Sequence, residues 1–168
     1  TLEPSSAASD VYKRQVYPGA LEICDQVDNN CNGTVDELDE NTFIGTYNLT
    51  TISPGIFGST VFDNGLITIT QGASLNSRQF DTYIYSDLLG GSVQNFTLNF
   101  SLVCGNVIVD GQQNTSVTCG AGVFIGPSTE TGTYNELDDS SFTLIINDDE
   151  AGTCGGPVAA QFLLEKVN

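Results

Sequence analysis

The chain has 168 residues and is strongly acidic: 21 Asp and Glu residues face 4 Lys and Arg residues, for a formal net charge of −17. Nucleic acid is excluded as an expected partner because almost no basic side chains exist to neutralise phosphates. No stretch approaches the roughly 18 apolar residues that a membrane helix needs, so no membrane-spanning segment is expected.

The chain is predicted to have three parts. Residues 1–15 contain Lys13 and Arg14, half of the basic residues, and we treat this run as a non-native or disordered segment outside fold reasoning. Residues 16–42 are predicted to form a metal-binding loop and an acidic hinge. Residues 43–168 are predicted to form one β domain, since hydrophobic residues make up 39% of the sequence and can fill a core.

Oxygen-bearing side chains recur at fixed spacing after Cys24. Counted from Asp28, they stand at positions 1, 3, 5, 9 and 12, with Gly33 at position 6, which is the ligand spacing of an EF-hand-type calcium loop. A sharp turn at position 6 favours glycine because it has no Cβ. The predicted ligands are the side chains of Asp28, Asn30, Asn32, Asp36 and Asp39 and the backbone carbonyl of Thr34.

Calcium is the predicted metal because these ligands are all hard oxygens. The chain has no His and no Met, so the usual donors of copper and zinc sites are missing. Only Asp28, Asp36 and Asp39 carry formal charge among the ligands, which predicts a weak affinity of about 10⁻⁴–10⁻³ M. The alternative is an acidic, disulfide-stapled turn without a metal, since Asn, Asp and Gly clusters form loops in any case.

This stretch resembles the short MopE-type metal-binding repeat of secreted and surface-exposed bacterial proteins. The matching residues are Glu22, Cys24, Asp25, Asp28, Asn29, Cys31, Gly33, Asp36 and Glu37. Asn30 and Asn32 depart from the repeat, which has aspartate at both positions. The stretch is also similar to the calcium loops of dockerins and thrombospondin type 3 repeats. The name of the family hints at copper as the bound metal. We do not carry copper over to this chain, because it has neither Trp nor His.

Five cysteines in a small acidic chain suggest an oxidising compartment. Cys24 and Cys31 are expected to close a short ring across the front of the loop, worth about 2.5 kcal/mol on the chain-entropy model. Such a staple would suit a loop with few apolar residues.

The other three cysteines lie in the predicted β domain. Asp110-Gly111 between two β-type runs predicts a hairpin that places Cys104 opposite Cys119. This bridge is favoured and leaves Cys154 free, and Cys119–Cys154 is the competing pairing.

From Phe43 onward the hydrophobic pattern has a period of two, which is typical of β-strands. The clearest strand opens at Asn95, where every second residue from Phe96 to Leu102 is apolar. Further strands are predicted at 45–51, 66–71, 79–85, 106–109, 114–118, 121–125, 141–147 and 159–167. Together they predict an all-β fold, an antiparallel β-sandwich of immunoglobulin-like or jelly-roll-like type.

The predicted β domain is similar to uncharacterised modules of large secreted surface proteins of marine bacteria. The runs that carry this likeness are Leu-Val-Cys-Gly at 102–105, Val-Thr-Cys-Gly at 117–120, Gly-Thr-Tyr at 132–134 and Asp-Asp-Ser-Ser-Phe-Thr-Leu at 138–144. The likeness implies an extracellular or cell-surface location and carries no activity.

No enzymatic activity is expected. Without histidine there is no Ser-His or Cys-His nucleophile and no His base. The acidic clusters at 136–139 and 148–150 flank a strand and should lie roughly 23 Å apart, too far for a catalytic carboxylate pair.

The predicted function is that of a non-enzymatic extracellular calcium-binding structural or adhesion module within a larger protein. Calcium would stiffen the junction between loop and β domain. One alternative is a carbohydrate-binding module, in which Asp81, Tyr83 and Tyr85 form an aromatic platform on one strand face and the partner is a surface glycan. The other is a self-assembling filament subunit. Neighbouring domains of the same protein are further expected partners.

Overall fold

The alternation that predicts strands is also the pattern of burial. In the strand that contains Phe96 and Leu102, the apolar residues are buried and the residues between them are exposed or half-buried. The computed structural model describes residues 16–38, 41–90 and 94–167. The predicted non-native or disordered segment, residues 1–15, and the predicted calcium ligand Asp39 lie outside these ranges. No helix in the described ranges is both long and apolar enough to cross a membrane.

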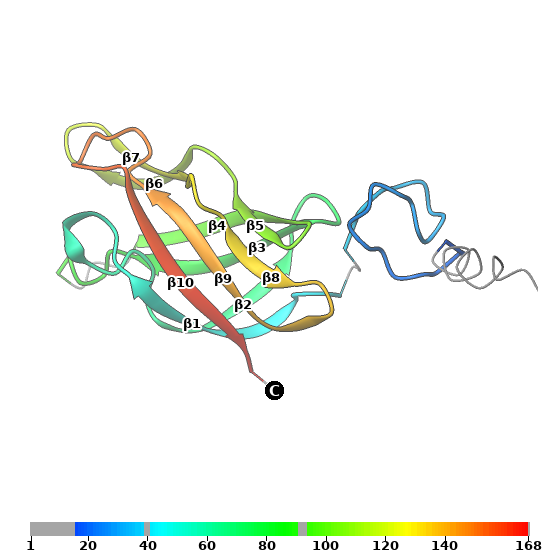
Figure 1. The fold of residues 1–168 in the computed structure, drawn as a ribbon. Coiled ribbons are helices and arrows are strands. Elements are labelled where there is room, and N and C mark those ends of the chain that lie inside the picture. The colour runs from blue at the N-terminus through cyan, green and yellow to red at the C-terminus, as the bar shows by residue number, and fades with distance from the viewer. Residues whose placement is uncertain (1–15, 39–40, 91–93, 168) are drawn as a thin grey trace, which may run out of the picture.

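Ten strands and one short 3₁₀ helix, η1, make up the described secondary structure (Figure 1). Their bounds are β1 (Gly45–Ser53), η1 (Ile56–Gly58), β2 (Gly65–Gln71), β3 (Ser77–Ile84), β4 (Gln94–Val103), β5 (Asn106–Val109), β6 (Gln113–Thr118), β7 (Gly122–Pro127), β8 (Gly132–Asn135), β9 (Asp138–Asp148) and β10 (Val158–Lys166).

The strands close into an antiparallel barrel, so the predicted β-sandwich is wrong. The order β10-β1-β2-β3-β4-β5-β8-β9 returns to its start because β9 also pairs with β10, which gives a ring of eight strands. β7 pairs with β9 beyond the end of β8, and β6 pairs with β7 outside the ring. Sandwiches and barrels both bury alternate residues, so the period of two did not distinguish them.

Aromatic rings fill the barrel. Phe62 packs against Phe80 and Phe162 with ring centroids 5.9 and 4.8 Å away. Phe142 packs against Phe100 at 5.8 Å. An eight-stranded barrel is just wide enough for side chains to fill, and here large ones do so.

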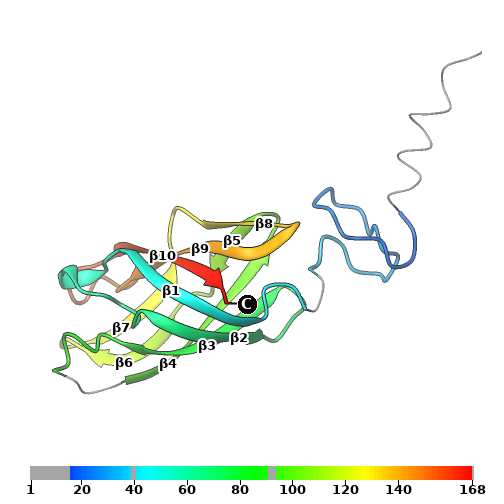
Figure 2. The ribbon, with the colours of Figure 1, turned by 90° about the horizontal axis from the view of Figure 1, so that it is seen from below.

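One end of the barrel faces the N-terminal loop, residues 16–38 (Figure 2). The fully buried Arg78 lies at the start of β3 and donates to the carbonyl of Thr42 from Nε and from one terminal nitrogen, at 2.9 and 2.7 Å. The other terminal nitrogen donates to the carbonyls of Leu75 and Ser77. A buried guanidinium needs such acceptors. These bonds fix the backbone at the point where the chain enters the barrel.

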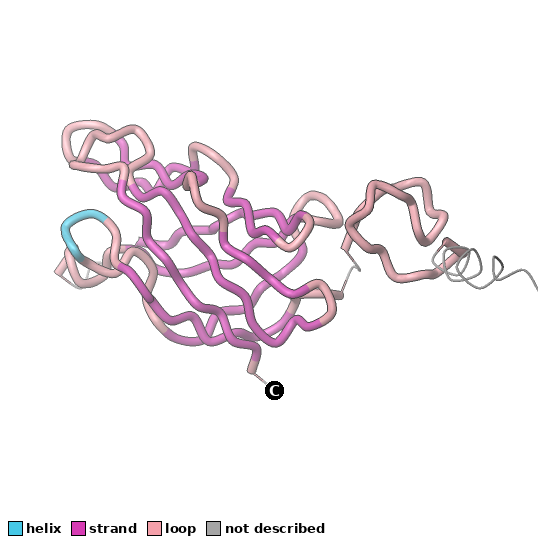
Figure 3. Tube along the Cα trace, in the orientation of Figure 1, coloured by secondary structure: helices cyan, strands magenta, loops and turns pink. Residues whose placement is uncertain are grey.

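At the opposite end, near η1 (Figure 3), the buried carboxylate of Asp148 accepts hydrogen bonds from the Tyr85 hydroxyl and from the Ile56 backbone N–H, the latter at 2.9 Å. Tyr85 is only 2% exposed because the chain turns at a φ of 51° just after β3. The predicted aromatic platform of Tyr83 and Tyr85 is therefore wrong, since only Tyr83 reaches the surface.

Asp149 is also fully buried, and its carboxylate holds the turn that follows β9. It accepts hydrogen bonds from the backbone N–H groups of Thr153, Cys154 and Gly156 at 3.0, 2.5 and 2.9 Å. Burial alone would raise the pKa of this carboxyl, but the hydrogen bonds outweigh burial and lower it.

Tyr85→Phe should lower the free energy of unfolding by about 1–3 kcal/mol, because it removes a donor from a buried carboxylate oxygen. Tyr83→Phe removes the same hydroxyl from a side chain that is 45% exposed and should change stability by less than about 0.5 kcal/mol. Urea unfolding of both variants measures the difference. Equal stabilities would contradict the assigned role of Tyr85.

The two neighbouring carboxylates should give opposite pH dependences. Burial raises the pKa of Asp148, against the hydrogen bonds from Tyr85 and Ile56, so its contribution to stability falls as the pH rises above about 4. The lowered pKa of Asp149 makes its contribution disappear as the pH falls below about 4. Relative to the wild type, Asp148→Asn should gain stability as the pH rises above that value. Asp149→Asn should gain it as the pH falls. Unfolding curves that stay parallel at all pH values would contradict both assignments.

Candidate metal site in the N-terminal loop

Side chains, rather than strand or helix pairing, hold the N-terminal loop together. The Glu22 carboxylate spans it: one oxygen accepts the Asn30 N–H at 2.7 Å and the other accepts the Asp36 N–H at 3.2 Å. The buried Asn29 accepts the Ile23 N–H at 3.0 Å. The backbone around the predicted ligands is therefore folded without an apolar core of its own.

Three of the predicted ligands lie together around the turn at Gly33. Oδ1 of Asp28 and Oδ1 of Asn30 both accept the Asn32 N–H, at 3.1 and 2.9 Å. Oδ2 of Asp28 accepts the Gly33 N–H at 2.8 Å, and Oδ1 of Asn32 accepts the Thr34 N–H at the same distance. Gly33 has a φ of 93°, in the left-handed region that favours glycine. These contacts bring oxygens from positions 1, 3 and 5 into one turn.

Glu37 joins this group, although the ligand spacing did not predict it. Its Oε1 accepts hydrogen bonds from the side-chain amides of Asn30 and Asn32, at 2.7 and 2.5 Å. The residue is 5% exposed, and its Oε2 is buried without a hydrogen-bond partner. These three side chains line a depression of about 330 Å³. Position 10 supplies no ligand in the EF-hand pattern, so the sequence signals for Glu37 were its match to the MopE-type repeat and its negative charge beside the predicted ligands.

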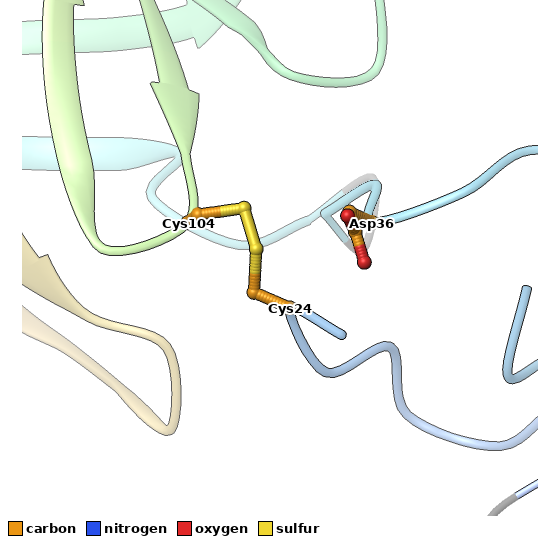
Figure 4. Close-up of side chains that lie close together, drawn as sticks. All are labelled: Cys24, Asp36 and Cys104. Carbon is orange, nitrogen blue, oxygen red and sulfur yellow. A yellow bond between two sulfur atoms is a disulfide. The ribbon is translucent and has the colours of Figure 1, made fainter. Parts of the chain in front are cut away.

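Asp36 makes its contacts elsewhere. Its Oδ1 accepts the backbone N–H groups of Asp25 and Gln26 at 3.1 and 3.0 Å. Figure 4 shows its carboxylate beside Cys24 and Cys104, and a carboxylate oxygen and the two sulfurs lie within 4.8 Å of one another. Because the two sulfurs form a disulfide, they offer no thiolates to a metal in this state. The predicted ligand roles of Asp36 and of the Thr34 carbonyl remain predictions.

Both favoured cysteine pairings are wrong. Cys24 pairs with Cys104, Cys119 makes the competing pairing with Cys154, and Cys31 is free and exposed.

The physical reason is the position of the hairpin turn. β5 pairs with β4 across Cys104-Gly105, where both residues have positive φ (51° and 76°), as a two-residue type I′ turn requires. The segment at Asp110-Gly111 leads instead to β6, which pairs with β7. Cys104 therefore stands at the tip of a turn that faces the loop, away from Cys119.

A second contact docks the loop on the barrel. The side chain of Asn76, in the turn between β2 and β3, accepts the Leu38 N–H at 2.8 Å and donates to the Asp36 carbonyl at 3.4 Å. The Asn76 carbonyl accepts the N–H of Leu102 on β4. Leu38 packs against the barrel core. Loop and barrel are thus joined by a disulfide and by an amide clamp.

The residues around Glu37 fit a hard cation. A buried carboxylate oxygen without a donor is costly, and a bound cation would neutralise it. Asn30 and Asn32 turn their amide nitrogens to Glu37, and their oxygens, like those of Asp28, accept backbone N–H groups of the turn. These oxygens are of the type that calcium or magnesium takes.

Among known families, a MopE model described as a "Putative metal-binding motif" matches residues 10–37. The match covers the loop and leaves the barrel unassigned. Neither curated proteins nor solved structures gave a significant match. The family therefore supports metal binding by the loop and does not identify the metal.

The disulfide pattern predicts that Cys31 alone reacts with iodoacetamide in the unreduced chain, because the other four cysteines are bonded. Peptide mapping after unfolding without reductant checks this, and Cys31→Ser should abolish the label. A label on Cys104 with none on Cys31 would show that the stapled ring of Cys24 and Cys31 forms instead.

Proposed function

We propose that the N-terminal loop binds one calcium ion through the side chains of Asp28, Asn30, Asn32 and Glu37, with the Thr34 carbonyl as a further ligand. The observation that carries this proposal is the buried, partnerless Oε2 of Glu37 beside the two asparagine amides. When bound, the ion would supply positive charge to the side-chain oxygens of the loop, which accept hydrogen bonds from backbone and side-chain amides in this structure. Asp36 would act by shaping the loop.

The donor set favours calcium over copper or zinc. Two carboxylates, two amide oxygens and a carbonyl are hard ligands, and calcium takes six to eight of them. Copper and zinc sites draw mainly on His, Cys and Met, and this chain has no His and no Met. Two charged ligands predict weak binding, in the range of about 10⁻⁴–10⁻³ M that suits extracellular calcium modules.

In this proposal the chain is a non-catalytic structural or adhesion module on a cell surface or in a secreted protein. The net charge of −17 and the two disulfides support such a setting. Since the loop is docked on two turns of the barrel, calcium would stiffen the connection between the barrel and whatever precedes the loop. Carbohydrate binding gains no support, because Tyr85 is buried and leaves Tyr83 without a second exposed ring on its strand.

Glu37→Gln and Asp28→Asn should each raise the dissociation constant for calcium at least about tenfold, since each removes a charged ligand. The matched control is Asp25→Asn. It removes one charge from the same loop, but at an exposed carboxylate that only caps the Val27 N–H. Isothermal titration of the full oxidised chain measures all four affinities.

A loss of affinity that is the same in Asp25→Asn as in Glu37→Gln would mean that calcium responds to overall charge, and the site assignment would fail. The choice of metal would also be contradicted if the oxidised wild-type chain bound copper or zinc more tightly than calcium. The proposal would be supported by one calcium site in the wild type that is kept by Asp25→Asn and weakened in Glu37→Gln and Asp28→Asn.

A further inference from the structure

The Cys24–Cys104 disulfide joins two elements that are also held in place by other bonds. Cys104 sits in the type I′ turn between β4 and β5, where its carbonyl accepts the Asn106 side-chain amide at 2.9 Å. The segment after Cys24 is held by the Asp36 carboxylate through the Asp25 and Gln26 N–H groups. Breaking the disulfide would leave these contacts in place.

The loop would also stay near the barrel. The Asn76 side chain binds the backbone of Asp36 and Leu38, and Leu38 packs against the core, independently of the sulfur atoms. In the disulfide form a carboxylate oxygen of Asp36 and the two sulfurs lie within 4.8 Å of one another. Because the contacts above do not depend on the sulfur–sulfur bond, we expect the two thiols to stay beside this carboxylate after reduction. Cys24 is exposed, so a reductant in solution can reach the disulfide.

We propose that reduction of Cys24–Cys104 creates a second metal site, which binds a thiophilic divalent cation such as Zn²⁺ through the two thiolates and Asp36. Thiolates are the ligands that such cations prefer, and three protein ligands with one water form a common four-coordinate zinc site. The site takes ligands from the loop and from the barrel, so the metal would replace the disulfide as their link.

A thiol reductant can reduce the Cys24–Cys104 disulfide by thiol–disulfide exchange. Two reductant thiols give up two electrons and two protons and form their own disulfide, while the bond between Cys24 and Cys104 breaks and each sulfur becomes a thiol. The entering cation then displaces the two thiol protons to solvent. This site shares no ligand with the proposed calcium site, so either proposal can fail without the other.

A competing pair of thiols must be distinguished. In the reduced chain Cys24 could bind a metal together with Cys31, which is exposed on the same loop. The structure favours Cys104 because it already lies with Cys24 beside Asp36.

Cobalt(II) tests the proposal, because bound thiolates give it a sulfur-to-metal charge-transfer absorption. The full chain, reduced with a phosphine, should bind one Co²⁺ with this absorption, and Zn²⁺ should displace it. The oxidised chain should give none. Cys31→Ser should behave as the wild type. Cys104→Ser should lose the absorption, and Asp36→Asn should weaken binding about tenfold or more, equivalent to about 1.4 kcal/mol.

Near-ultraviolet circular dichroism of the tyrosines verifies that each reduced variant keeps the folded barrel. A reduced wild type without the absorption would overturn the proposal. So would an absorption that survives Cys104→Ser, because the metal would then be held by Cys24 with Cys31 or by the pair Cys119 and Cys154. Calcium titration of the oxidised chain, which contains no free Cys24 or Cys104 thiol, reports separately on the loop site.

Discussion

The pairing of β10 with both β1 and β9 is the constraint on which the rest of the structure depends. It closes eight strands into a ring, so these strands leave two open ends for neighbouring elements, and the sheet ends only at β6, outside the ring. The loop docks at one end because the turns between β2 and β3 and between β4 and β5 both point there. Asn76 and Cys104, one in each turn, are the residues that hold it.

The buried carboxylates show how an acidic chain tolerates its charge. Asp148 and Asp149 are fully buried, and every oxygen has at least one donor, supplied by Tyr85, Ile56 and the turn after β9. Glu37 is nearly as buried and keeps one oxygen without a donor. The fold supplies donors to both of these carboxylates, although at Asp148 burial outweighs the hydrogen bonds and raises the pKa. Glu37 differs because its buried Oε2 accepts no hydrogen bond, and this unpaired oxygen is the physical basis for proposing a cation at the loop.

The sequence predicted what depends on local pattern and missed what depends on which elements meet in space. The alternation from Phe96 to Leu102 and the glycine at position 33 were enough to predict a strand and the turn of the loop. β8 was missed because its four residues carry one half-buried aromatic, Tyr134, in a polar run. Barrel closure, the partner of Cys24 and the position of Glu37 each depend on a contact between distant segments. The Asp110-Gly111 signal predicted the wrong hairpin turn, because β4 already turns back into β5 at Cys104-Gly105.

Glu22 and Asp36 connect the two candidate metal sites without being ligands of the calcium site. The Glu22 carboxylate holds the Asn30 N–H with one oxygen and the Asp36 N–H with the other, so the backbone of a proposed calcium ligand and that of the residue beside the disulfide are fixed to the same group. A displacement of Asp36 by a metal at the two cysteines would be transmitted to Asn30 through this carboxylate. By thermodynamic linkage, any such effect must be reciprocal: a metal at the thiolates and calcium at the loop change each other's affinity by the same factor.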